Sequence, residues 1–225
     1  MLVSEALFLL LSNKSDRFEI GVSHQRVALN GALLCDLVAT GLATITEGTS
    51  PSAAAADGAA KRASSHPALA HGVDRLEKKG QTPVYSVIHS RKFADKEALA
   101  QRLIEEGVLD QERASFLGLT WSRFPEKDET IEAAMRSRYR AIFHGKVEPR
   151  PEEAIVILLL KNTGELRRVF LDEIQGVPFN DVRSRVRDID RAVLESATFE
   201  HAREINTVLD AVAKAAAVEE EAASS

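Results

Sequence analysis

The chain has 225 residues and a formal net charge of −5, and 44% of its residues are hydrophobic. This length suits one large domain or two small ones, and the hydrophobic content is ordinary for a globular protein. The negative charge argues against a general nucleic-acid binder, because neutralising phosphates requires a basic surface. The single Cys excludes an intrachain disulfide and a zinc–thiolate cluster, and it fits a reducing compartment. We therefore expect a cytoplasmic protein.

The N-terminal region predicts a short helix followed by a buried one. Residues 4–11 form a short apolar segment, and residues 27–45 are apolar with few polar interruptions. A helix that is apolar nearly all round has no side for solvent, so it should lie in the middle of a bundle. Gly31 inside this helix costs about 1 kcal/mol relative to Ala, which predicts that a neighbouring helix crosses there at close range.

The middle and C-terminal parts of the chain predict further helices around that centre. Residues 43–46 could form a short strand, and residues 48–65 lack large apolar side chains, which predicts a flexible or disordered loop. The helical spacing of apolar residues predicts amphipathic helices that begin near Pro67, Pro83, Asp95, Thr130, Pro151, Asn180 and Thr198. Residues 218–225 are acidic and predict a disordered tail.

An apolar pattern that ends in Gly occurs three times, before Gly41, Gly107 and Gly164. A Gly after the last turn can take the left-handed conformation that ends a helix. The pattern predicts three buried helices that end in the same way. Ordinary helix ends explain it as well as an internal duplication does.

Residues 116–125, FLGLTWSRFP, break the helical pattern and contain the only Trp. Their period favours a hairpin or an extended loop. Taken together, the segments predict an all-α, single-domain protein over residues 1–217. Its central buried helical bundle would be wrapped by amphipathic helices, with one small β-hairpin.

Signals for catalysis, metal binding and membrane spanning are weak. The chain has no Gly-rich phosphate loop, no nucleophile elbow and no zinc-protease motif, so we expect no catalytic residues, no cofactor and no enzyme activity. His66 and His71 are five residues apart, which does not fit a shared metal on one helix face, so we expect no metal site. The apolar runs are shorter than the roughly 18 residues that a spanning helix needs, and a secretory signal is not expected.

Basic residues gather in three places along this acidic chain. They are Arg136 to Arg150, Arg183 to Arg191, and the trio Arg91, Lys92 and Lys96. A local basic patch can attract an anionic membrane, at about 1 kcal/mol per residue near the surface. The alternative is that these are ordinary helix surfaces on which Arg pairs with Glu.

Several segments, in order, resemble the Golgi phosphoprotein family. ALFLLLSNKSDRF followed by LNGALLCDLVATGLATI is similar to the opening of that family, and LAQRLIEEGVLDQERASFLGL resembles its second signature. KVEPRPEEAIVILLL and DVRSRVRDI match its later helices in position and pattern. The resemblance covers most of the chain, apart from the Ala-rich residues 48–65.

The resemblance implies a mostly helical fold and, in animal and fungal members, binding to phosphatidylinositol 4-phosphate through one Trp and three Arg. Those four positions fall near Gly21, Asn30, Phe93 and Lys96 in this chain, and of these Lys96 keeps the charge. Neighbouring cations can substitute for the missing ones. The headgroup-binding residues expected from the resemblance and its neighbourhood are Arg26, Asn30, Arg91, Lys92 and Lys96.

The resemblance also implies that an apolar hairpin enters the bilayer beside the headgroup. Aromatic side chains favour the headgroup zone, and the candidates are Phe116, Leu117, Leu119, Trp121 and Phe124. We therefore expect a lipid-binding protein, peripheral on the cytoplasmic face of a membrane, whose partner is an anionic phospholipid surface. The alternative is a non-enzymatic interaction protein that self-associates through residues 116–125 without lipid. A helical DNA-binding regulator is a weaker option, opposed by the net charge.

Overall fold

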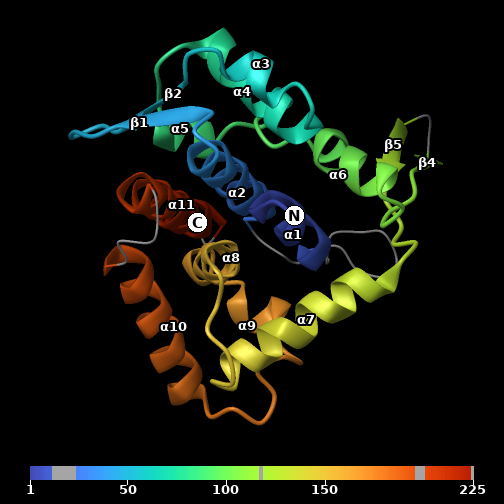
Figure 1. Ribbon diagram of the computed structural model, residues 1–225, viewed down its shortest axis with the longest axis vertical. Helices are drawn as coiled ribbons and strands as arrows, with labels where there is room; N and C mark the ends of the chain where they lie inside the picture. The colour runs from blue at the N-terminus through green and yellow to red at the C-terminus, as the bar shows by residue number, and fades with distance from the viewer. Residues whose placement is uncertain (12–23, 117–118, 196–200, 224–225) are drawn as a thin grey trace.

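The computed structural model describes residues 1–11, 24–116, 119–195 and 201–223, and it is mainly helical, as predicted (Figure 1). The helices are α1 (Val3–Leu11), α2 (Gln25–Ala39), α3 (Ala59–Ala63), α4 (Pro67–Lys79), α5 (Val84–Ile88), α6 (Lys96–Glu105), α7 (Glu129–Phe143), α8 (Pro151–Asn162), α9 (Leu166–Val169), α10 (Phe179–Glu195) and α11 (Ala202–Ala223). The strands are β1 (Ala43–Thr46), β2 (Ser52–Ala55), β3 (Thr82–Pro83), β4 (Glu112–Phe116) and β5 (Leu119–Arg123).

Helix α2 is the centre of the fold, as its apolar sequence predicts. All its residues from Val27 to Val38 are buried, and it packs against α1, α4, α5, α8 and α11. Figure 1 shows α3 to α6 on one side of α2 and α7 to α10 on the other. The same core cluster contains buried residues from α1 through α11, so the two sides share one hydrophobic interior.

Gly31 marks a close helix crossing in α2. A Cβ atom added there would lie 2.5 Å from Cγ2 of Val212 on α11 and 2.9 Å from Cδ2 of Leu159 on α8. This confirms the predicted close approach. Gly41 has a φ of +65° and ends the helix, with the N–H of Leu42 donating to the carbonyl of Leu37. The equivalent bond follows α6 and α8, so the three predicted helix ends are alike.

Helix α1 is buried along its whole length, and its first turn is fixed by a carboxylate from α2. Asp36 accepts hydrogen bonds from the backbone N–H groups of Val3, at 2.8 Å, and Ser4, at 2.9 Å. The Ser4 hydroxyl donates to it at 2.6 Å. The carboxylate therefore satisfies N–H groups that a buried helix start would leave without partners.

Two small antiparallel sheets are present in the described residues, where the sequence predicted one hairpin. Strand β1 was predicted, but its partner β2, and β3 that pairs with β2, were not. The expectation of a flexible loop at residues 48–65 is wrong where β2 and α3 form. Ala53, Ala59 and Ala63 are buried in the shared core. Their small side chains allow the backbone to lie close to its neighbours, so this segment gains burial from packing on α4.

The expectation of a disordered tail at residues 218–225 is also wrong for residues 218–223, because α11 continues to Ala223; the last two residues lie outside the described part of the chain. Ala is the strongest helix former, and this part of the helix is rich in it. Glu219 near its end also contacts Arg26 and His24 on the N-terminal side of α2. The Ala content and the contacts of Glu219 together favour helix beyond the buried part of α11.

Candidate functional site

The segment between α5 and α6 is fastened to the central helix by the side chain of Asn30. The Asn30 amide nitrogen donates to the carbonyls of Ile88 and Ser90, each at 2.7 Å, and its oxygen accepts from the N–H of Ala94 at 2.9 Å. The residue is only 1% exposed. Asn30 is therefore a structural clamp, and its expected contact with a headgroup is wrong in this arrangement.

Three of the predicted cations line one pocket beside that clamp. Arg26 lies on the first turn of α2, Arg91 on the clamped segment and Lys96 on the first turn of α6. The pocket has a volume of about 560 Å³. Asp95 accepts a hydrogen bond from the N–H of Ala98 at 3.1 Å, so it caps α6 as predicted and sets the position of Lys96.

Two carboxylates also line this pocket. They are Asp95, which caps α6, and Glu97, which accepts a hydrogen bond from the Ser122 hydroxyl at 2.6 Å. Three cations and two carboxylates leave one net positive charge on the lining. Burial lowers the pKa of Lys96, because partial removal from water disfavours its ammonium form. An anion close to Lys96 would favour the charged form again.

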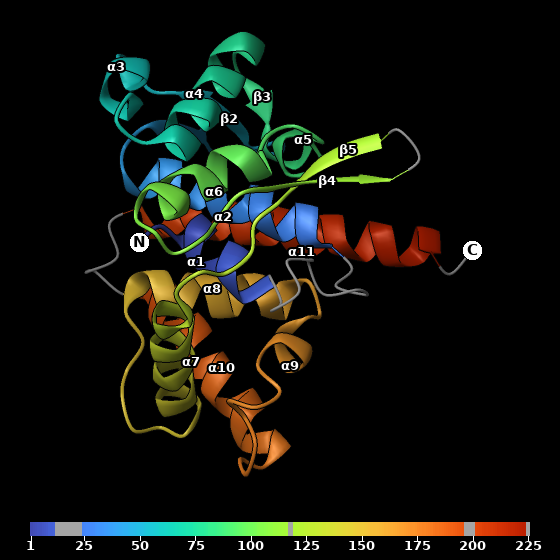
Figure 2. The ribbon, with the colours of Figure 1, turned by 90° about the vertical axis from the view of Figure 1, so that its right-hand side faces the viewer.

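Strands β4 and β5 pair as a hairpin, which confirms a hairpin at the Trp-containing segment, although it begins at Glu112 and not at residue 116 (Figure 2). Residues of β5 line one wall of the pocket. Trp121 lines the pocket and is 47% exposed. Phe124 also contacts the pocket, but it is 7% exposed and its ring packs edge-on against Phe8 at 6.0 Å. Trp121 is thus available at the surface, and Phe124 belongs to the core. The side chains of Phe116, Leu117 and Leu119 lie outside the described part of the chain.

One comparison with protein families covers nearly the whole chain. The family profile described as Golgi phosphoprotein 3 (GPP34) matches residues 2–220. The chain belongs to the Golgi phosphoprotein 3 family. No curated protein matches it.

In this Golgi phosphoprotein 3 family member, the four positions given by the resemblance do not all line the pocket. Asn30 and Phe93 are buried, and Lys96 lines the pocket. The position near Gly21 lies outside the described residues. Lys92 is exposed but does not line the pocket, and its carbonyl lies 2.9 Å from Nε2 of His71. The neighbours Arg26 and Arg91 therefore supply the pocket's other charges.

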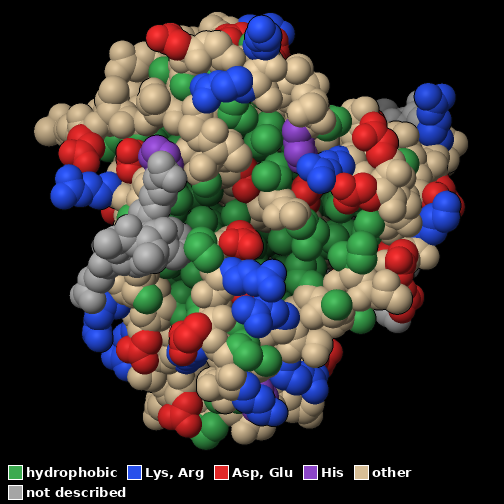
Figure 3. Space-filling view, viewed as in Figure 1, with side chains coloured by type: hydrophobic (Ala, Val, Ile, Leu, Met, Phe, Trp, Pro, Cys, Tyr) green, Lys and Arg blue, Asp and Glu red, His purple; other side chains and the backbone are tan. Residues whose placement is uncertain are grey.

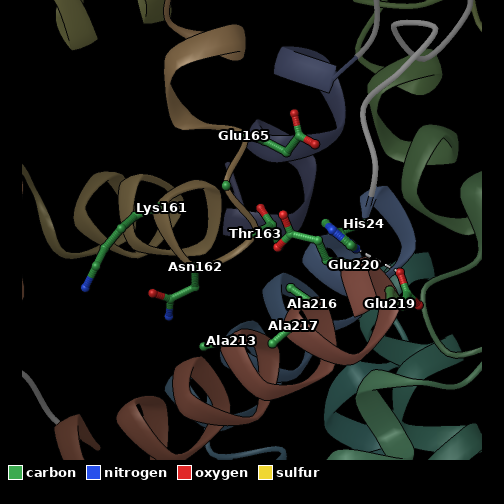
Figure 4. Close-up of a pocket in the computed structure, with 11 residues that line it drawn as sticks. His24, Lys161, Asn162, Thr163, Glu165, Ala213, Ala216, Ala217, Glu219 and Glu220 are labelled. Carbon is green, nitrogen blue, oxygen red and sulfur yellow. Dashed lines mark hydrogen bonds and ion pairs between the residues drawn. The ribbon is translucent and has the colours of Figure 1, made fainter. Parts of the chain in front are cut away.

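A larger pocket, of about 730 Å³, lies between the end of α8 and α11 (Figure 4). Three carboxylates line it, from Glu165, Glu219 and Glu220, against one lysine and one histidine. Its charge is unfavourable for a phosphate group while the Glu219 carboxylate lies on its wall. The smaller pocket beside Trp121 suits an anion better, although it has less volume.

Several residues of the other basic runs are engaged within the protein. Arg136 pairs with Glu132 and Glu173, and Arg138 pairs with Glu153. Arg185 donates to the carbonyls of Ile142 and Val147. Figure 3 shows Lys and Arg interspersed with Asp and Glu over the face seen in Figure 1. For these runs the structure favours ordinary helix surfaces over a membrane patch.

Two further findings concern the residues that the structure describes. None of their helices combines the length and the apolar character needed to cross a bilayer. No three of their His, Cys, Asp or Glu side chains gather as a metal site would require. His66 is buried and its Nε2 lies 3.2 Å from Oε1 of Glu5, so it contacts another helix of the core.

Proposed function

We propose that this protein is a peripheral membrane protein that binds the headgroup of an anionic phospholipid, as phosphatidylinositol 4-phosphate-binding members of its family do. It acts by binding and not by catalysis, on the cytoplasmic face of a membrane. The observation that carries the proposal is the pocket in which Arg26, Arg91 and Lys96 lie beside exposed Trp121.

The chemistry of the lining fits a phosphate at a membrane surface. Arg guanidinium groups can hold phosphate oxygens through two parallel hydrogen bonds, whereas Lys acts as a point charge. Lys96 also stands at the start of α6, where the helix dipole favours an anion. Trp favours the headgroup zone of a bilayer. Trp121 would therefore enter the interface while the three cations contact the phosphate.

The test is co-sedimentation with vesicles of phosphatidylcholine containing phosphatidylinositol 4-phosphate or phosphatidylserine. The R91E/K96E variant should bind several-fold more weakly than the wild type. R187E/R191E is the matched control, because it makes the same charge change at exposed residues of α10. Binding should also weaken as salt is raised, because salt screens exposed charges. Equal loss in the two variants would contradict the site, and no binding by the wild type would contradict the function.

A second candidate function is self-association through the hairpin, and exposed Trp121 is the observation that favours it. A large exposed apolar side chain can mark a protein–protein contact. Size measurements of the wild type and W121D, without lipid, test this candidate. A larger species that W121D converts to a smaller one would support it, and one unchanged monomeric size would contradict it.

A further inference from the structure

The C-terminal helix places one carboxylate among three basic side chains next to the proposed headgroup pocket. Glu219 of α11 pairs with the Arg26 guanidinium. Its Oε2 lies 3.0 Å from Nδ1 of His24, and its Oε1 lies 3.9 Å from Nδ1 of His89. Residues 193 positions apart in the chain thus meet at one anion.

Two of the basic side chains around Glu219, Arg26 and His89, are held by other parts of the fold as well. Arg26 also donates to the carbonyl of His89, which joins α2 to the end of α5. The His89 ring packs against the Tyr85 ring at an interplanar angle of 55°, with ring centroids 4.5 Å apart. Nε2 of His89 is buried and has no hydrogen-bond partner in the described parts of the structure. Arg26 and His89 therefore have contacts that would remain if the carboxylate left.

We infer that His24, Arg26 and His89 form a second anion subsite, which accepts a further phosphate of a lipid headgroup and which Glu219 fills when no lipid is bound. The role in lipid binding rests on the proposed function. Arg26 belongs to both sites, because it lines the headgroup pocket and pairs with Glu219. The carboxylate therefore competes directly with the phosphate for this guanidinium.

Glu219 and its neighbour Glu220 form a matched pair for testing this subsite. Figure 4 shows the Glu219 carboxylate beside His24, whereas Glu220 turns towards Thr163. E219Q and E220Q remove the same charge from adjacent positions of one helix. The buried residues that anchor α11, such as Val212 and Ala215, are untouched by both changes. Equal unfolding midpoints for the two variants check that the fold is kept.

The experiment measures binding of the full chain to two probes, inorganic phosphate and phosphatidylcholine vesicles containing phosphatidylinositol 4-phosphate. E219Q should bind both more tightly than E220Q and the wild type, by roughly two- to fivefold, which is the range of a partly exposed ion pair. Adding R26Q to E219Q should abolish the gain. Equal affinities of E219Q and E220Q for both probes would overturn the inference.

The two probes separate this inference from the proposed function. Wild-type protein that binds no vesicles would contradict the proposed function. If E219Q then still bound inorganic phosphate more tightly than the wild type, this would support a subsite for free phosphate. Equal affinities would overturn the subsite. Tighter phosphate binding without tighter vesicle binding would overturn the part assigned to the lipid headgroup.

Discussion

Asn30 on the buried helix holds Ser90 on the segment that carries Arg91, through a hydrogen bond of 2.7 Å between its amide nitrogen and the Ser90 carbonyl. With its bonds to Ile88 and Ala94, this side chain connects the core to the pocket. A polar side chain in the buried part of α2 therefore positions the segment that carries Arg91.

The first prediction concerns this clamp. N30A should lower the free energy of unfolding by about 2 to 4 kcal/mol, because it leaves backbone groups of residues 88–94 without their partners. Vesicle binding should weaken as well, because Arg91 lies on the released segment. Urea unfolding and co-sedimentation measure the two effects. N206A is the control, because Asn206 donates one hydrogen bond within its own helix, to Ala202. An N30A variant as stable as N206A would contradict the clamp.

The second prediction concerns the helix crossing at Gly31. G31A should lower the free energy of unfolding by about 1 to 2 kcal/mol, since overpacking against Val212 exceeds the gain in helix propensity. G31A should lower the free energy of unfolding by less in a V212A background, because V212A removes the atom that lies 2.5 Å from the new Cβ. A double-mutant cycle in urea measures this coupling. Simple additivity of the two changes would show that the crossing is not tight.

The third prediction concerns pH. Burial raises the pKa of Asp36 from 3.8 to about 6, although the Ser4 hydroxyl and the backbone N–H groups of Ser4 and Val3 act in the opposite direction. The folded state therefore holds this proton more tightly than the unfolded state. The resulting stabilisation is fully present below about pH 4 and is lost as pH rises through about 6.

The measurement is the free energy of unfolding of the wild type and D36N across this range. The difference between wild type and D36N should shrink or reverse as pH rises from about 4 to 6, and it should be constant above that range. Glu5 does not confound the comparison, because both proteins contain it. Burial raises the pKa of Glu5, but contacts with His66 and with the N–H of Leu2 outweigh it and hold this pKa below its usual value. Parallel pH curves for the two proteins would contradict the raised pKa of Asp36.

The fourth prediction separates the two aromatic residues on the pocket wall. W121A should weaken binding to anionic vesicles without lowering the unfolding midpoint, because Trp121 is 47% exposed. F124A should lower the free energy of unfolding by about 3 kcal/mol, because Phe124 is buried and packs on Phe8. Denaturant unfolding and co-sedimentation test both. A large loss of stability in W121A would place this side chain in the core instead.

The sequence predicted those parts of the fold in which the pattern is local and strong. The apolar residues from Val27 to Val38 need a buried position whatever surrounds them, and α2 is buried as expected. Strand β2 and helix α3 could not be predicted in this way, because Ala residues bury little surface by themselves. Their order depends on close packing against α4.

The candidate site was predictable only where its residues could be located from the sequence itself. Lys96 and Arg91 follow from positions given by the family resemblance and from their close neighbours in sequence. The structural role of Asn30 depends on contacts about 60 residues away, and the Glu219 contact with Arg26 spans 193 residues. Such long-range polar contacts leave no periodic signal in the sequence.

The most direct test of the lipid-binding pocket uses Trp121, the only Trp in the chain. Its fluorescence reports on the pocket that it shares with Arg26, Arg91 and Lys96. Addition of vesicles containing phosphatidylinositol 4-phosphate should shift the emission to shorter wavelength, because the ring leaves water for the headgroup zone. Vesicles of phosphatidylcholine alone, or the R91E/K96E variant with anionic vesicles, should give no shift. An unchanged emission of the wild-type protein with anionic vesicles, or the same shift with neutral ones, would contradict binding at this pocket.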